Sequence, residues 1–243
     1  MKPFINDYDD IMELLDDMVA SVKWDEFYGE RRRPAPFIVQ NTMPDENLVE
    51  FIKGNDSIRT AVELGCGEGR NSIYMAKRGI EVTALDISPV AIENAGRIAK
   101  ENGVTVDFRC QDVVKSKMDG KFDFVYDSGM LHHLPPHKRI TYVELLQAIL
   151  KPGGYFGLTC FAWGENCADE VDDWEFYDRK FNAGVAFTKE RIIELFSPCF
   201  DVIEIRKYRD GVLGTIQGLK FIWTCLLKDK RGNENKMEKK DNE

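Results

Sequence analysis

The stretch "AVELGCGEGR", residues 61–70, places three glycines within five positions directly behind a short apolar run. A glycine-rich turn at the end of the first strand of an open α/β sheet lets a nucleotide approach bare backbone. The helix that follows such a turn offers free N–H groups at its start. This stretch therefore predicts a nucleotide-like ligand at the carboxyl end of the first strand.

The spacing of the glycines narrows the kind of ligand. Gly65, Gly67 and Gly69 form a GxGxG pattern, whereas a dinucleotide-binding turn prefers GxGxxG. Glu63 stands two positions before the first glycine, where a carboxylate is poorly placed beside phosphates but well placed beside a sulfonium or ammonium cation. The pattern favours a ligand without a pyrophosphate.

The rest of the chain alternates strand-like and helix-like segments. Strand-like runs cover residues 59–64, 80–86, 104–110, 122–127, 154–161, 200–208 and 219–227, and helical patterns cover residues 7–22, 70–78, 89–101, 137–150 and 188–196. Repeated strand–helix units predict an α/β fold with a mainly parallel sheet that is covered by helices on both faces.

Two acidic residues follow later strands at the same predicted edge of the sheet. Asp86 ends the second strand, 21 positions after Gly65, and a carboxylate there can accept hydrogen bonds from both hydroxyls of a ribose. Asp112 follows the third strand, where its side chain can accept from an adenine amino group. These acids extend the predicted site from the turn to a nucleoside.

Four motifs in this order, "VELGCGEGR", "VTALDIS", "CQDVV" and "FDFVYDSGMLHHL", resemble those of the class I S-adenosylmethionine-dependent methyltransferases. The resemblance covers roughly residues 46–161 and continues through the two final strands. It implies a Rossmann-like, seven-stranded, mainly parallel sheet with helices on both faces and an antiparallel last strand. The stretch "GCGEGRNSIYMAKRG" and, over a shorter match, "LPPHKRITY" are also similar to the tellurite-resistance and thiopurine methyltransferase group.

The resemblance implies S-adenosylmethionine as the cofactor. The cofactor is expected to lie across the glycine turn, with Asp86 on its ribose and Asp112 near its adenine. The cofactor-binding residues expected on this basis are Glu63, Gly65, Cys66, Gly67, Gly69, Asp86, Ile87, Asp112, Val113 and Asp127.

The candidate catalytic residues follow the fourth predicted strand, where all three histidines of the chain lie within six positions. Methyl transfer from a sulfonium is an in-line displacement, and it needs a base only if the acceptor must lose a proton. We expect His132 or His133 to line the pocket and to act as that base, although either imidazole could instead cap the next helix. Asp127 is the third catalytic candidate, with capping of the following loop as its alternative role. His137 is expected to be structural.

Two segments outside the shared motifs are candidates for substrate contact. The segment "WDEFYGERRRPAPF", residues 24–37, is a possible lid, and residues 162–187 read as an insertion over one end of the sheet. Aromatic residues at such spacing also pack simply onto a domain, and an arginine run is often a solvated face. The candidate substrate-binding residues are Tyr28, Arg33, His132 and Trp163.

The length of the chain is that of a single large domain. We expect the methyltransferase domain to cover residues 46–228, with the insertion at 162–187 near the substrate. An N-terminal helix and lid segment would occupy residues 1–45, and a charged, disordered tail residues 229–243.

Composition indicates the class of partner. The net charge of −9 argues against a protein that neutralises the phosphates of a nucleic acid, so a small-molecule substrate is expected. The six cysteines are scattered without metal-ligand spacing, and no metal is expected. No apolar run approaches the roughly 18 residues of a membrane span, and the N-terminus lacks the pattern of a signal peptide, which favours the cytoplasm. The sequence leaves the oligomeric state open.

The sequence leaves the acceptor atom open, and it leaves two other functions possible. The acceptor atom is oxygen, nitrogen, sulfur or a heavier chalcogen, because specificity lies in the variable segments. A non-catalytic protein that binds S-adenosylmethionine would keep Gly65, Gly67 and Asp86. A nicotinamide-dependent oxidoreductase would share the fold and Asp86, but the GxGxG spacing and Glu63 argue against it.

Overall fold

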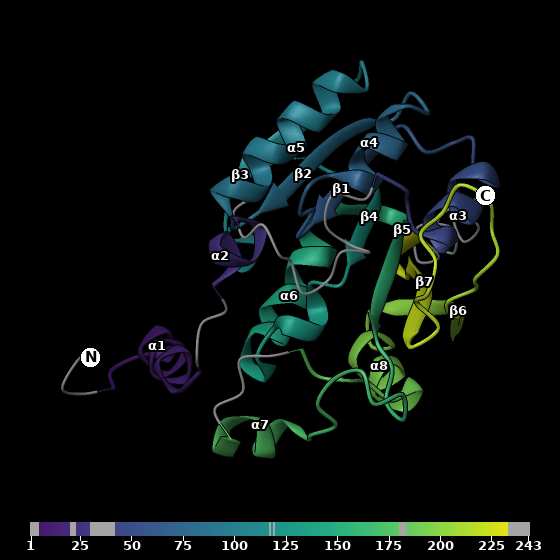
Figure 1. The fold of residues 1–243 in the computed structure, drawn as a ribbon. Coiled ribbons are helices and arrows are strands. Elements are labelled where there is room, and N and C mark those ends of the chain that lie inside the picture. Colours follow the sequence, from purple (N-terminus) through teal and green to yellow (C-terminus); the bar gives the residue numbers. More distant parts are fainter. Residues whose placement is uncertain are drawn as a thin grey trace, which may run out of the picture.

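The computed structural model describes residues 5–19, 23–29, 42–116, 118, 120–179 and 184–232. One seven-stranded sheet forms its centre, with the strand order β3-β2-β1-β4-β5-β7-β6 (Figure 1). The strands are β1 (Thr60–Leu64), β2 (Glu81–Asp86), β3 (Asp107–Cys110), β4 (Phe122–Ser128), β5 (Leu150–Phe161), β6 (Phe200–Lys207) and β7 (Ile222–Asp229). Neighbouring strands are parallel except at β7, which is antiparallel to both β5 and β6. The expected mainly parallel sheet with an antiparallel last strand is confirmed.

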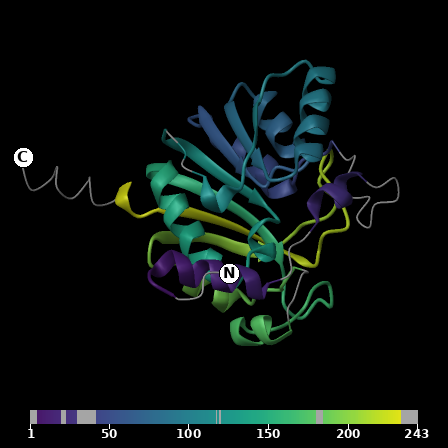
Figure 2. The ribbon, with the colours of Figure 1, turned by 90° about the vertical axis from the view of Figure 1, so that its left-hand side faces the viewer.

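Helices cover both faces of this sheet (Figures 1 and 2). They include α3 (Glu46–Lys53), α4 (Arg70–Ala76), α5 (Pro89–Glu101), α6 (Pro136–Ile149) and α8 (Lys189–Phe196). In α3 and α4, Leu48 and Met75 pack in one core that contains Ala61 of β1. Tyr142 of α6 packs in the other core, with Val62 of the same strand. Neighbouring residues of a strand point to opposite faces, so two cores enclose the sheet.

Local sequence signals explain where several of these helices begin. The Ser88 hydroxyl accepts a hydrogen bond from the Ala91 N–H at 3.2 Å at the start of α5, and Pro89 occupies the first turn. Thr188 caps α8 in the same way, accepting from the Arg191 N–H at 3.1 Å. These starts agree with the predicted helices.

Three predicted strands have clearly different bounds in the structure: β5, β3 and β7, the last of which spans Ile222–Asp229 and not residues 219–227. β5 begins at Leu150 rather than at residue 154, because Leu150 pairs with Phe122 before a register irregularity. The expected turn is still present inside the strand, since Gly153 has a φ of 78°. β3 is shorter than predicted, and only four residues pair with β2.

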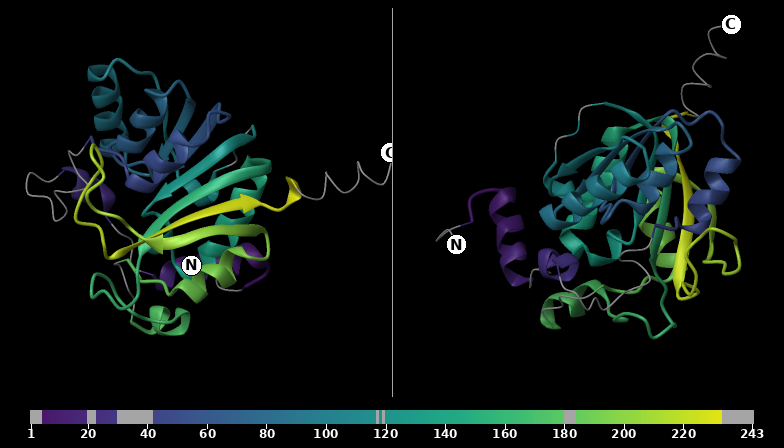
Figure 3. Two further views of the ribbon diagram at one scale, coloured as in Figure 1. Left: turned by 90° about the vertical axis from the view of Figure 1, so that its right-hand side faces the viewer. Right: turned by 45° about the horizontal axis from the view of Figure 1, so that its top comes forward.

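Two helices, α1 and α2, come before α3 in the described part of the N-terminal region. α1 (Tyr8–Met18) lies at one side of the molecule (Figure 1 and Figure 3, right). Asp16 fastens it to the start of α6, because its carboxylate contacts Nε2 of His137 at 3.0 Å and Nζ of Lys138 at 2.6 Å. The second helix, α2 (Trp24–Gly29), was not predicted as a helix and packs against α5. Residues 30–41, which include the arginine run, lie outside the described residues, as do residues 233–243 of the expected tail.

The segment at residues 162–187 contains a further short helix, α7 (Asp173–Arg179), which lies below α6 in Figure 1. Arg139 of α6 holds it through an ion pair of 2.6 Å with Asp173. The far end of the segment returns to the sheet, where the Val185 N–H donates to the carbonyl of His132 at 2.8 Å. The segment therefore meets the predicted catalytic turn. None of the helices in the described parts of the chain has the length and apolar character needed to cross a membrane.

Candidate active site

The glycine turn after β1 has a backbone that L-residues rarely adopt. Gly65, Gly67 and Gly69 have φ values of 67°, 54° and 78°. A Cβ atom at Gly65 would lie 2.8 Å from Cβ of Met130, and one at Gly67 would lie 2.7 Å from Oη of Tyr28. Both positions therefore require glycine for conformation and for space.

Asp86 is hydrogen-bonded to this turn. Its buried carboxylate accepts hydrogen bonds from the N–H groups of Gly67 at 2.8 Å and of Ser88 at 2.9 Å. Burial raises the pKa of Asp86, and these backbone N–H groups lower it in part. Each carboxylate oxygen can accept more than one hydrogen bond, so the group can still receive ribose hydroxyls. The next side chain, Ile87, is 53% exposed and offers an apolar surface beside that position.

Glu63 lies behind the turn and is almost completely buried. It accepts from Nδ2 of Asn71 at 3.1 Å and from the N–H of Ser72 at 2.8 Å, and also from the Ser72 hydroxyl. Burial raises the pKa of Glu63 to about 7, although the Ser72 hydrogen bonds and the charge of Arg70 oppose this rise. Near neutral pH, a cation close to Glu63 would shift it to the ionised form.

A buried polar network, which was not predicted from the sequence, lies on the other side of the turn. Arg70 Nη1 lies 2.8 Å from a carboxylate oxygen of Asp45, and Nη2 donates to the Ser128 hydroxyl at 2.8 Å. Ser128 in turn donates to Asp45 at 2.6 Å. Burial alone would raise the pKa of Asp45, but the Arg70 charge and the hydrogen bonds outweigh it, and the pKa is lowered. The signal available in the sequence was the pair of polar residues Arg70 and Ser128, which stand inside the motifs "VELGCGEGR" and "FDFVYDSGMLHHL".

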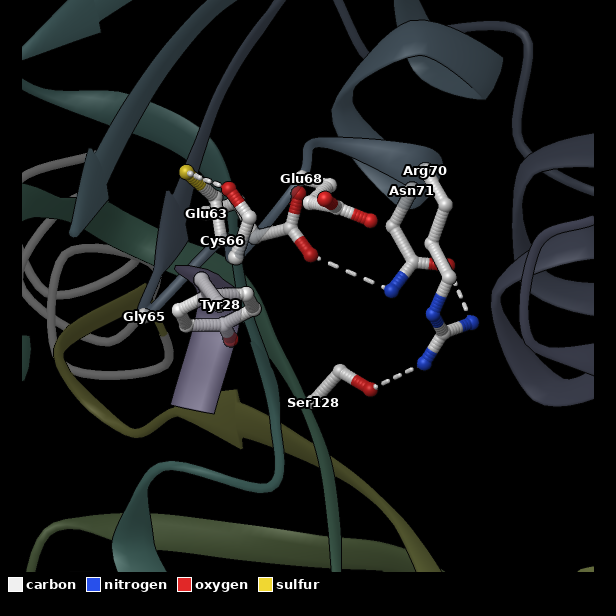
Figure 4. A pocket seen from close by; sticks show the side chains of 9 residues that line it. Tyr28, Glu63, Gly65, Cys66, Glu68, Arg70, Asn71 and Ser128 are labelled. Atoms are coloured by element: carbon white, nitrogen blue, oxygen red, sulfur yellow. Dashed lines mark hydrogen bonds between the residues drawn. The ribbon is translucent and has the colours of Figure 1, made fainter. Parts of the chain in front are cut away.

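These groups surround a small cavity, which is shown in Figure 4. Its lining residues are Tyr28, Glu63, Gly65, Cys66, Gly67, Glu68, Arg70, Asn71 and Ser128. The cavity encloses about 40 Å³, whereas small-molecule sites commonly measure roughly 300–1,000 Å³. The Tyr28 ring is buried with its hydroxyl end against Gly67 and takes up the space above the turn. Tyr28, expected at the substrate, is therefore part of the pocket at the glycine turn.

His132 lies in a short turn of helix, η2 (Leu131–His133), directly after the Met130 side chain that covers Gly65. Its ring stacks on Phe161 with centroids 3.8 Å apart, and Nδ1 accepts from the Phe161 N–H at 3.3 Å. Burial and the neighbouring His133 hold the pKa of His132 well below its usual value. The imidazole is thus a neutral group fixed against β5.

His133 has a different environment. Its Nδ1 atom is buried and has no hydrogen-bond partner among the described residues. The Trp24 ring of α2 meets it edge to face, with centroids 4.8 Å apart and planes at 82°. Burial lowers the pKa of His133 to about 4, so the ring is neutral at physiological pH. Burial of a nitrogen without a hydrogen-bond partner costs free energy of folding. A ligand that supplied this hydrogen bond would recover that cost, so His133 is suited to bind one.

The Asp127 carboxylate faces away from this cavity, toward α6. It accepts from the N–H groups of Met130 at 2.6 Å and Leu131 at 3.0 Å, and from the Tyr142 hydroxyl at 2.6 Å. Burial raises the pKa of Asp127 to about 6, against the lowering effect of these hydrogen bonds. The geometry corresponds to the alternative role given above, in which Asp127 caps the loop before His132.

The remaining predicted site residues are spread more widely. Asp112 caps a short helix, η1 (Val113–Lys115), through the Val114 N–H at 3.0 Å, and Val113 is buried in the core. Trp163 is 40% exposed at the start of the inserted segment. Arg33 lies outside the described residues. His137 joins three helices, because its ring nitrogens contact Asp16 of α1 and, at 2.8 Å, the Tyr177 hydroxyl of α7.

Comparison with known proteins agrees with this architecture. Residues 61–154 match the family described as "Methyltransferase domain". The chain is 38% identical over 95 residues to the ubiquinone biosynthesis O-methyltransferase of Xanthomonas euvesicatoria pv. vesicatoria (strain 85-10), covering 38% of this chain and 39% of that protein. It is 29% identical over 120 residues to the 2-heptyl-1-hydroxyquinolin-4(1H)-one methyltransferase of Mycobacteroides abscessus, covering 49% and 53%. The matches thus span about half or less of these curated relatives.

A solved structure extends the likeness to nearly the whole chain. The Burkholderia thailandensis 1,6-didemethyltoxoflavin-N1-methyltransferase, with bound 1,6-didemethyltoxoflavin and S-adenosylhomocysteine, has a TM-score of 0.62 at 18% identity. The match covers 94% of this chain and 92% of that one. The fold is that of the class I S-adenosylmethionine-dependent methyltransferases, as the motifs predicted. Residues 61–154, which carry the glycine turn and Asp86, are the part of the chain that matches the methyltransferase domain family.

Proposed function

We propose that this protein is an S-adenosylmethionine-dependent methyltransferase that acts on a small-molecule acceptor. The observation that carries the proposal is the hydrogen bond between Asp86 and the Gly67 N–H, which joins an acid suited to ribose to a turn without side chains. Glu63 behind that turn supplies a carboxylate whose charge suits a cationic ligand. The residues present therefore fit the cofactor.

The cofactor assignments follow from these positions. Asp86 binds the ribose hydroxyls, the exposed side chain of Ile87 packs on the adenine, and Glu63 balances positive charge on the methionine portion. Asp112 keeps its proposed place near the adenine, since its cap on η1 leaves carboxylate lone pairs available. The bound cofactor supplies a methyl group on a cationic sulfur, which becomes a neutral thioether after transfer.

The proposed acceptor atom is oxygen, and His133 is the proposed base. A neutral imidazole with a buried nitrogen that lacks a partner among the described residues can accept a hydrogen bond from a hydroxyl group. The names of two relatives support oxygen, since one is an O-methyltransferase and the other a methyltransferase of a 1-hydroxyquinolone, whereas the structural neighbour is an N1-methyltransferase. His132 and Asp127 position this base, because they fix the two sides of its turn.

We further propose that the protein works in the cytoplasm and does not bind nucleic acid. The net charge of −9 supports the second point. All six cysteines, each of them in the described part of the chain, are free thiols, as is usual in a reducing compartment.

Calorimetric titration of the full chain with S-adenosylmethionine, S-adenosylhomocysteine and NADH tests the cofactor assignment. We expect micromolar affinity for the two sulfur nucleosides and no binding of NADH. A folded protein that binds neither sulfur nucleoside would overturn the proposal, and preferential binding of NADH would favour the oxidoreductase alternative.

Transfer of a labelled methyl group to a panel of hydroxyl, amine and thiol acceptors then separates an enzyme from a non-catalytic binding protein. Transfer to a hydroxyl compound is the expected result. Cofactor binding without transfer to any acceptor would favour the binding protein.

A further inference from the structure

Helix α2 places two aromatic rings on the two halves of the proposed site. Trp24 and Tyr28 are four residues apart and lie on one face of the helix, with ring centroids 6.4 Å apart. Tyr28 covers Gly67, whereas Trp24 contacts the ring of His133. One short helix therefore covers both the glycine turn and the proposed base.

On the side of His133 next to His132, the turn packs against β5 and the inserted segment. His132 lies next to His133, with centroids 4.4 Å apart, and is stacked on Phe161 of β5. Gly184 closes this surface from the other side, because a Cβ there would lie 2.6 Å from the Phe161 ring and 3.0 Å from His132. The turn that carries His132 and His133 is therefore packed between the sheet and the inserted segment.

Helix α2 packs against the start of α5. It is six residues long, and its contacts include Tyr28 against Ala91 and a hydrogen bond of 2.5 Å from the Ser88 hydroxyl to Asp25. The cavity beneath Tyr28 encloses about 40 Å³, which is too small for a nucleoside. Binding of the cofactor at the glycine turn therefore requires α2 to shift, and Trp24 moves with Tyr28 because both belong to the same helix.

We propose that Trp24 occupies the acceptor subsite, and that the acceptor which takes its place is a planar aromatic compound with a hydroxyl group facing His133. The inference rests on the proposed function and names its substrate class. An indole ring against His133 shows that this position accepts a flat apolar group. A hydroxyl on such a ring would also provide the hydrogen-bond partner that Nδ1 of His133 lacks among the described residues.

The proposed methyl transfer requires only the cofactor, the acceptor hydroxyl and His133. The acceptor oxygen forms a bond to the methyl carbon, the carbon–sulfur bond breaks with its electron pair going to sulfur, and the hydroxyl proton passes to His133. Burial is the cause of the lowered pKa of His133. The acceptor that takes the place of Trp24 keeps His133 buried, so the imidazole stays neutral and can accept the hydroxyl proton.

The test compares Trp24→Ala with Trp174→Ala, a matched control whose ring is 85% exposed on α7. The probes are catechol, its non-planar counterpart cyclohexane-1,2-diol, and 3-methylindole, which is the tryptophan side chain as a free molecule. Each is titrated into the full chain in the presence of S-adenosylhomocysteine. We expect Trp24→Ala to bind catechol at least about fivefold more tightly than the parent chain, because an occupied subsite lowers apparent affinity. We also expect 3-methylindole to compete with catechol in this variant, and cyclohexane-1,2-diol not to bind.

Three results would contradict the proposal that Trp24 occupies the acceptor subsite. Weaker catechol binding in Trp24→Ala would mean that Trp24 is a wall of the acceptor subsite and not its occupant. Equal changes in Trp24→Ala and Trp174→Ala, or equal binding of the planar and non-planar diols, would also overturn the inference. Any of these results with S-adenosylhomocysteine still bound leaves the proposed function standing, whereas loss of that binding in the parent chain overturns the proposed function itself.

Discussion

Asp86 and Gly67 are joined by a hydrogen bond of 2.8 Å, in which the backbone N–H of the glycine donates to the buried carboxylate. The bond links the end of β2 to the turn after β1, two places that are 19 residues apart in the chain. It holds an acid and a bare backbone segment in one rigid unit at the carboxyl edge of the sheet. The proposed cofactor site depends on this unit.

Replacement of Asp86 by Asn should weaken binding of S-adenosylhomocysteine by about 2 kcal/mol, or roughly thirtyfold in Kd. The amide keeps the shape of the side chain but loses the charge that strengthens hydrogen bonds from ribose hydroxyls. The measurement is calorimetric titration, with exposed Asp107→Asn on β3 as the control. Equal affinities for the two variants would remove Asp86 from the ribose assignment.

Affinity for S-adenosylmethionine should rise with pH between about 6 and 8. The pKa of Glu63 in the protein is about 7, above its ordinary value of 4.5, so the side chain holds a proton below pH 7. A cationic ligand favours the ionised form, and binding at low pH must therefore release that proton. Titrations in buffers of different ionisation enthalpy will detect the release, and Glu63→Gln should abolish it. Binding in the parent chain that is independent of pH would contradict the assignment of Glu63 to the cation.

Gly67→Ala should lower the free energy of unfolding by about 1–3 kcal/mol through its positive φ, with a further loss from crowding. The added Cβ would lie 2.7 Å from Oη of Tyr28. Gly79→Ala is the matched control, because Gly79 has a φ of 78° but no heavy atom within 4 Å of an added Cβ. Denaturant unfolding of both variants separates strain from crowding. If Gly67→Ala costs no more than Gly79→Ala, Tyr28 does not pack tightly on the turn.

Arg70→Met should destabilise the protein by about 3–5 kcal/mol, because it leaves the carboxylate of Asp45 buried without its cation. The control is Arg97→Met, which removes an exposed pair with Glu101 and should cost at most about 0.5 kcal/mol. The double variant Asp45→Asn with Arg70→Met should recover part of the loss. Similar unfolding midpoints for the two single variants would show that the buried pair contributes little.

His133→Asn should reduce kcat for methyl transfer to an aromatic hydroxyl by about a hundredfold or more. The affinity for S-adenosylhomocysteine should stay unchanged, since the proposed role of His133 is to take the acceptor proton. His137→Asn is the control, because His137 joins α1, α6 and α7 and is not placed at the acceptor. Unchanged kcat in His133→Asn would mean that the hydroxyl loses its proton without this base.

The sequence by itself determined the sheet and the positions of the turn and of Asp86. Glycine spacing, an acid at the end of a strand, and alternating strand and helix patterns are short-range signals, because each reflects the backbone conformation and burial of a few neighbouring residues. They predicted the helices over residues 89–101 and 188–196, which begin at Pro89 and Lys189 in the structure, and they placed the three histidines directly after β4.

Only the tertiary structure decided which side chains meet at the site. Asp45 reaches Arg70 across 25 residues of chain, and α2 brings Trp24 and Tyr28 onto His133 and the glycine turn. The structure also turned the Asp127 carboxylate toward α6. These outcomes depend on which face of a strand a residue occupies and on how a distant helix packs. Long-range packing is decided by the whole core, and for that reason no local pattern in the sequence contained it.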